Sequence, residues 1–114
     1  MKVTYKNDKC GRVFPEWTLD GALLTLRGGA LTLDLDALTR DDPALLLVME
    51  DAQGRLALGE GRRYVAELRL PARRYAVEKI GFADDFGFPA LRRVALPFSA
   101  EDVVLTLWAE REVG

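Results

Sequence analysis

The segment 22–35 constrains the fold more than any other part of the chain, because apolar residues alternate on both sides of a Gly28-Gly29 dipeptide. A two-residue turn at this dipeptide would pair Leu24 with Leu33 across the turn. The residues that then share one face are Ala22, Leu24, Leu26, Leu31, Leu33 and Leu35. Period-2 alternation and turn chemistry therefore agree on a β-hairpin with one buried face.

The remainder of the chain also consists of short apolar segments separated by turn residues. Glycine and proline divide it into short segments rich in Leu, Val, Tyr and Thr, which is typical of an all-β sandwich or barrel. The chain has 114 residues, 49% of them hydrophobic, and no Ser/Gly-rich or Pro-rich linker. We expect a single all-β domain, 1–114: an antiparallel β-sandwich or barrel of about 8 short strands with at most one or two helical turns.

Residues 43–53 fit either a strand or a helix. The Asp-Pro dipeptide before the apolar run and Gly54 after it could be the two caps of a helix. A strand is favoured, because a hairpin loop at 51–54 would give the run a partner in 55–58. The segment 99–102 resembles a capping box, and we expect one helical turn there.

Two later segments are predicted as strands. In 63–70, Tyr64 alternates in phase with Leu68 and out of phase with Val65, so Tyr64 and Val65 are expected on opposite faces. The segment 103–110 is largely apolar on both faces, which predicts a strand that is central in its sheet or covered on both sides.

The residue inventory argues against an enzyme. The chain has no histidine and a single cysteine, Cys10. This removes the commonest general base, the Ser-His and Cys-His nucleophile pairs, and ordinary zinc sites. The Asp pairs at 41–42 and 84–85 lack the spacing of a calcium loop and sit where turns favour Asp. No phosphate-binding glycine motif is present, and we expect no catalysis, no metal and no cofactor.

Charge and hydropathy bear on partners and location. The formal net charge is −2, and no nucleic-acid reader motif is recognisable. The longest apolar run, 44–49, is too short to cross a bilayer, and the first residues lack the apolar stretch of a signal peptide. We expect a soluble, cytoplasmic protein with neither nucleic acid nor membrane as a partner.

The segment 81–89 is the first candidate binding region. It places Phe82, Phe86 and Phe88 in a loop that also carries two Asp and two Gly. Loops rarely need so much aromatic area, and exposed aromatic side chains anchor interfaces. The simpler explanation, which the sequence favours, is that Phe82 and Phe88 fold back as plugs over the open end of the sandwich.

Arginine doublets are the second candidate. They occur at 62–63, 73–74 and 92–93. Neighbouring strands could gather Arg73, Arg74, Arg92 and Arg93 into a patch for an anion or an acidic partner. The simpler explanation is that charged strand ends discourage pairing between sheet edges.

Two functions follow from these observations. The favoured one is a non-enzymatic interaction or assembly module, such as a small bacterial or bacteriophage structural protein, with a protein partner or a second copy as its target. The alternative is a β-domain that binds a glycan or a small anionic ligand. That site would combine Trp17, Phe86 or Tyr75 with Arg73 or Arg93. A carboxylate-based enzyme is least favoured.

Overall fold

The computed structural model describes residues 1–6, 12–83, 87 and 89–112, and these residues form strands arranged in four separate sheets. The largest sheet contains, in spatial order, β1 (Lys2–Lys6), β11 (Val104–Trp108), β8 (Arg63–Leu70), β6 (Ala44–Glu50) and β7 (Leu56–Leu58). A second sheet contains β3 (Trp17–Asp20), β4 (Leu23–Leu26) and β5 (Leu31–Asp34). The two remaining pairs are β2 (Arg12–Val13) with β12 (Arg111–Glu112), and β9 (Tyr75–Ala83) with β10 (Pro89–Ala95).

The all-β fold class is confirmed. The sheets do not close into a barrel, and the described residues form more strands than the eight or so that the sequence predicts. The expectation of purely antiparallel pairing fails at one place, because β1 pairs with β11 in parallel. Parallel neighbours require a long crossover connection, and here nearly the whole chain runs between the two strands.

The predicted hairpin is present as β4 and β5, in the predicted register. Leu24 pairs with Leu33, and Leu26 pairs with Leu31. Gly28 and Gly29 have φ values of 62° and 113°, which explains why glycine occupies both positions. The turn includes one feature that the sequence did not predict. Arg27, the residue before the dipeptide, also has a positive φ, so the turn, η1 (Arg27–Gly29), contains three successive residues with left-handed φ values.

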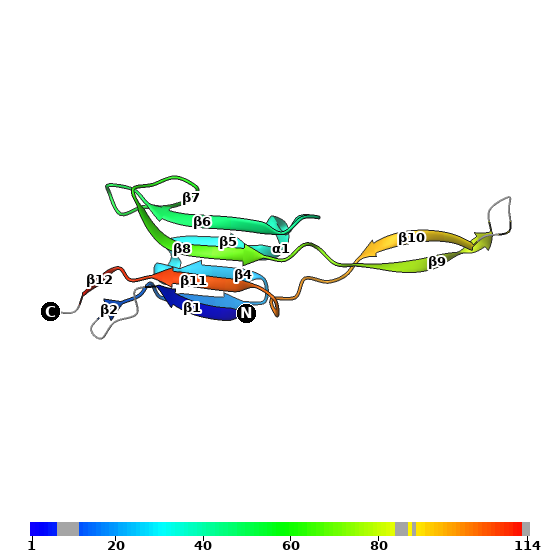
Figure 1. Ribbon diagram of the computed structural model, residues 1–114, viewed down its shortest axis with the longest axis horizontal. Coiled ribbons are helices and arrows are strands. Elements are labelled where there is room, and N and C mark those ends of the chain that lie inside the picture. Colours follow the sequence, from blue (N-terminus) through cyan, green and yellow to red (C-terminus); the bar gives the residue numbers. More distant parts are fainter. Residues whose placement is uncertain (7–11, 84–86, 88, 113–114) are drawn as a thin grey trace.

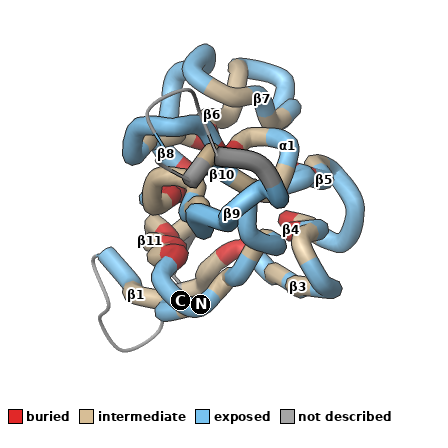
Figure 2. The backbone as a smooth tube through the Cα atoms, turned by 90° about the vertical axis from the view of Figure 1, so that its right-hand side faces the viewer, coloured by how far each residue is buried: buried red, intermediate tan, exposed pale blue. Residues whose placement is uncertain are grey.

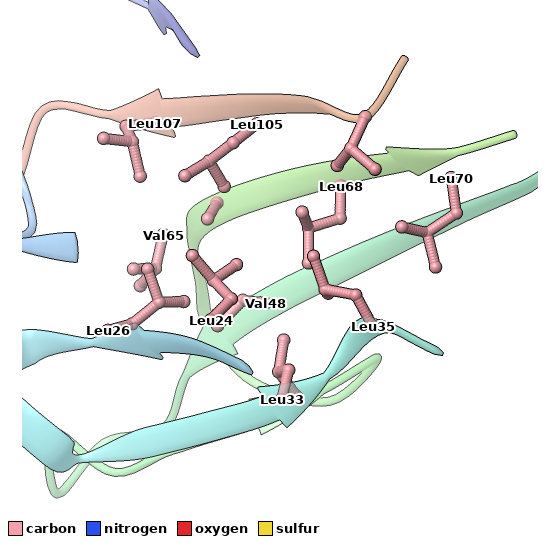
Figure 3. Close-up of a cluster of buried hydrophobic side chains, with 12 residues drawn as sticks. Leu24, Leu26, Leu33, Leu35, Val48, Val65, Leu68, Leu70, Leu105 and Leu107 are labelled. Carbon is pink, nitrogen blue, oxygen red and sulfur yellow. The ribbon is translucent and has the colours of Figure 1, made fainter. Parts of the chain in front are cut away.

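The hydrophobic core lies between the two larger sheets (Figure 3). Its buried side chains are Leu24, Leu26, Leu33, Leu35, Val48, Val65, Ala66, Leu68, Leu70, Val103, Leu105 and Leu107. Each fully buried leucine or valine contributes roughly 1.5–3 kcal/mol relative to an exposed position. The inward face predicted for the hairpin is therefore the one that the core uses.

Residues 44–50 form a strand, β6, as favoured from the sequence. Two partners hold it: β8 on one side and β7 on the other, the latter through the loop predicted at 51–54. In that loop the Asp51 carboxylate accepts hydrogen bonds from the backbone N–H groups of Arg55 and Gln53, which lower the pKa of Asp51. The sheet pairing outweighs the local helix signals.

Helical structure occurs where the sequence analysis did not place it. The short helix α1 (Leu35–Leu38) follows β5, and Asp34 caps it by accepting hydrogen bonds from the backbone N–H groups of Asp36 and Ala37. The expected helical turn at 99–102 is only a turn, closed by a hydrogen bond from the backbone N–H of Val103 to the carbonyl of Ala100.

The alternation predicted for 63–70 holds from Ala66 to Leu70 but fails before it. A β-bulge between β6 and β8 pairs Met49 with Tyr64 and leaves Val65 as the extra residue. Val65 and Ala66 are consequently both buried, whereas Tyr64 is half exposed and stacks beside Trp108. The strand β11 is central, as predicted, between β1 and β8.

A charged cluster ties the two sheets together at one end. Arg27, at the tight turn of the smaller sheet, forms ion pairs with Glu50 at the end of β6 and with Glu110 after β11. Arg63 adds an ion pair to Glu50 at 3.1 Å and donates a hydrogen bond to the Glu110 carbonyl at 2.9 Å. Burial alone would lower the pKa of Arg27, but the hydrogen bonds to Glu110 and Glu50 outweigh it and raise that pKa.

We predict that Glu50→Gln lowers the free energy of unfolding by about 1–3 kcal/mol, because two guanidinium groups lose their shared carboxylate in a partly buried site. Urea unfolding followed by circular dichroism measures the change. The matched control is Asp102→Asn, whose ion pair with Arg74 is exposed and should cost less than about 1 kcal/mol. Equal losses in the two variants would contradict a structural role for the cluster.

Candidate functional site

The hairpin β9–β10, which we call the arm, extends the β8–β11 pair beyond the sandwich. The last pair of the body joins Arg69 to Val104, and the first pair of the arm joins Tyr75 to Ala95. Two chain segments connect the body to the arm, and each contains a proline, Pro71 in the first and Pro97 in the second. Proline has no backbone N–H to donate, so the hydrogen-bond ladder stops there and the arm continues as a separate two-stranded ribbon.

The arm gives the molecule its elongated shape. Figure 1 shows β9 and β10 projecting away from the sheets along the longest axis, and Figure 2 views the molecule along that axis. The molecule measures 72 × 26 × 20 Å and has a radius of gyration of 19.3 Å. A compact domain of this length would have a radius of gyration of about 13 Å. A substantial part of the chain is therefore held outside the body.

Arg73 anchors the first strand of the connection to the body. Its guanidinium donates to the carboxylate of Asp36 at 2.8 Å and to the Asp36 carbonyl at 2.7 Å. Its backbone N–H donates to the carbonyl of Arg40 at 2.7 Å. The Tyr75 hydroxyl donates to Asp41, close to the same place. The capped helix α1 thus positions Asp36 to fix the start of the arm.

The other predicted arginines also make contacts within the chain. Arg74 pairs with Asp102 at 3.3 Å at the base of the arm. On the arm itself, Arg92 forms an ion pair with its cross-strand neighbour Glu78, and the Arg93 guanidinium lies 4.0 Å from the centre of the Tyr75 ring. The structure thus distributes these arginines between the base and the length of the arm rather than gathering them in one pocket.

None of the three aromatic candidates has a described side chain. The backbone of Phe82 belongs to β9, but its side chain lies outside the described residues. Phe86 and Phe88 lie outside them altogether. Their proposed role in recognition stays a prediction.

Apolar side chains that the sequence analysis missed are exposed along the described part of the arm. Val77 is 64% exposed, Leu91 58% and Ile80 39%. Val77 opposes Arg93, and Leu91 opposes Lys79. In the body, by contrast, buried residues oppose apolar residues across the strands. Apolar residues that pair with cations across the strands indicate a ribbon without a buried face. This pairing can be recognised only when the register of the two strands is known.

A small cavity lies at the base of the arm, with a volume of about 80 Å³. Arg73, Arg74, Phe98 and Ser99 contribute to its wall, and Trp17 and Tyr75 do not. Within the described ranges, no group of three or more His, Cys, Asp or Glu side chains is placed to hold a metal ion. No helix in the same ranges has the length and hydropathy to span a membrane.

Comparisons with known proteins identify no relative from which a functional site could be inferred. No family model, curated protein or solved structure significantly matches this chain. The arm and its anchored base are accordingly the candidate functional site on structural grounds alone.

We predict that Arg73→Ala loosens the arm while leaving the sandwich folded, because the Asp36 carboxylate and carbonyl lose their shared donor. Loss of about 1.4 kcal/mol at the base should speed amide hydrogen exchange in β9 and β10 by about tenfold. Hydrogen exchange with mass spectrometry resolves this region from the core strands. Arg62→Ala, an exposed doublet position on the body, is the matched control, and equal protection of the arm in both variants would contradict the anchoring role.

Proposed function

We propose that this protein is a non-enzymatic assembly module that binds other copies of itself through its arm. The observation that carries the proposal is the exposure of Val77 and Leu91 on a two-stranded ribbon that extends from the body. A small structural protein of a bacterium or bacteriophage, as the sequence predicts, would use such an arm to contact a neighbour in a particle.

The energetics of the arm support this proposal. An isolated two-stranded ribbon is marginally stable in water, because it buries little apolar surface. In the described part of the arm, β9 and β10 pair only with each other, so both edges carry unpaired backbone donors and acceptors, which are a template for further strand pairing. The anchoring contacts of Arg73 and Tyr75 hold the ribbon at its base and leave Val77 and Leu91 exposed farther along it. A partner chain would supply the missing burial.

Ligand binding, the alternative, has weaker support. Pockets for small molecules usually have volumes of about 300–1,000 Å³, far above the roughly 80 Å³ at the base of the arm. A larger, open hollow of about 280 Å³ lies beside Leu45 and Arg69, and none of the candidate residues lines it. The two arginines in that cavity wall, Arg73 and Arg74, are each already paired with an aspartate. A glycan or an anion would have to displace these intramolecular ion pairs.

We predict that the double variant V77E/L91E loses the self-association of the wild-type chain. Two new carboxylates on the arm would be costly to bury in any interface. Sedimentation velocity from micromolar to millimolar concentration measures the association. Leu45→Glu is the matched control, because Leu45 is 55% exposed and lies on the body.

The predicted result is association in the wild type and in the Leu45 variant, with a monomer for the double variant. Thermal unfolding verifies that all three chains fold. Monomeric wild-type protein at every concentration, or unchanged association of the double variant, would overturn the proposal.

A further inference from the structure

This inference rests on the proposed function and names the surface of the second copy that the arm contacts. We propose that the arm docks on the outward face of the three-stranded sheet of a second copy of this chain. The two surfaces are different parts of the molecule, and each is complementary to the other in charge and in apolar content.

One face of the arm combines apolar side chains with cations. Residues opposite each other in an antiparallel ladder share a face, so the register defines this arm face. Its members are Tyr75, Val77, Lys79, Leu91, Arg93 and Ala95. Within the described part of the arm, this face carries two cations and no carboxylate, because Glu78 lies on the other face in its ion pair with Arg92.

The outward face of the three-stranded sheet has the opposite character. The same register argument defines this acidic face, whose members are Thr18, Asp20, Leu23, Thr25, Thr32 and Asp34. Leu23 is 46% exposed and lies between two exposed carboxylates, Asp20 on one neighbouring strand and Asp34 on the other. No cation belongs to this set of described positions. A row of threonines lies beside Leu23 on this face, and their side chains are short. The hydroxyl oxygens of Thr25 and Thr32 are 3.5 Å apart.

The complementarity distinguishes this face from the other outward face of the body. On the five-stranded sheet, Lys2 and Lys6 lie on the outward side with Arg69. Among the described positions beside them in the register, the carboxylate is Glu67, which is paired with Arg69. Docking the arm face there would bring cations toward cations, whereas on the acidic face Lys79 and Arg93 meet Asp20 and Asp34. Val77 and Leu91 would then cover Leu23.

The arm face and the acidic face are distinct surfaces, so two copies can exchange arms reciprocally in a closed two-fold dimer. Where the docking angle prevents this exchange, the same contact repeats from copy to copy and generates a ring or a filament. A nine-residue strand such as β9 is about 30 Å long, enough for the arm to cross the three strands of the neighbour while its base stays clear.

Charge reversal on each surface tests the contact. The variants are Lys79→Glu on the arm face and Asp20→Lys on the acidic face. Asp20 is chosen over Asp34 because Asp34 also caps α1. Sedimentation velocity is measured for each variant alone and for their equimolar mixture. Lys2→Glu and Asp42→Lys are the matched controls, since they make the same charge changes on other exposed parts of the body.

The expected result has three parts. Each variant alone associates at least about tenfold more weakly than the wild type, because like charges then face each other. The mixture regains wild-type association, because the reversed arm meets the reversed face and the unreversed arm meets the unreversed face. The controls remain unchanged.

The outcomes separate this inference from the proposed function. If V77E/L91E abolishes association while Asp20→Lys has no effect, or the mixture fails to recover, the arm remains the contact and its placement on the acidic face is wrong. If the wild-type chain is monomeric at every concentration, both proposals fail. Melting temperatures of each variant within a few degrees of the wild type verify that the changes act on the contact and not on folding.

Discussion

The structure depends on the packing of leucines and valines between two sheets. The smaller sheet contributes Leu24, Leu26 and Leu33 from its inward face, and the larger sheet meets them with Leu68 and its neighbours. No element of this small domain could bury such a face alone, so the two sheets must stack. The cluster of Arg27 with Glu50, Arg63 and Glu110 adds ion pairs between the two sheets at one end of this layer.

The arm is the part of the described chain that has no second sheet packed against it. Its strands continue the same β8–β11 pair, but the ladder is interrupted at Pro71 and Pro97, and no second sheet stacks on the described part beyond them. The ribbon keeps cross-strand hydrogen bonds and the Glu78–Arg92 ion pair, which are worth little in water without burial. A partner surface would bury the apolar side chains of the arm, as the three-stranded sheet buries those of the five-stranded sheet in the body.

Prediction from sequence succeeded where local pattern and tertiary packing agree. The hairpin around Gly28 and Gly29 has one apolar face and the turn chemistry to match, so both its register and its buried side were predictable. Prediction failed at Val65, where a bulge imposed by the partner strand changes the phase, and at the parallel pairing of β1, which depends on residues far apart in sequence. Of the site, the arginines were identified as candidates, but their partners Asp36, Asp102 and Glu78 were not.

The sequence by itself determined the all-β class, the inward leucines and the short strands, because period-2 patterning and turn residues act over a few neighbouring positions. Only the tertiary structure decided that residues 75–95 leave the body as an arm. Strand propensity in this segment is the same as elsewhere, and the difference lies in what covers it. Whether a strand such as β9 is buried depends on the elements that fold against it, and a local pattern contains no information about an element that is absent from its surface.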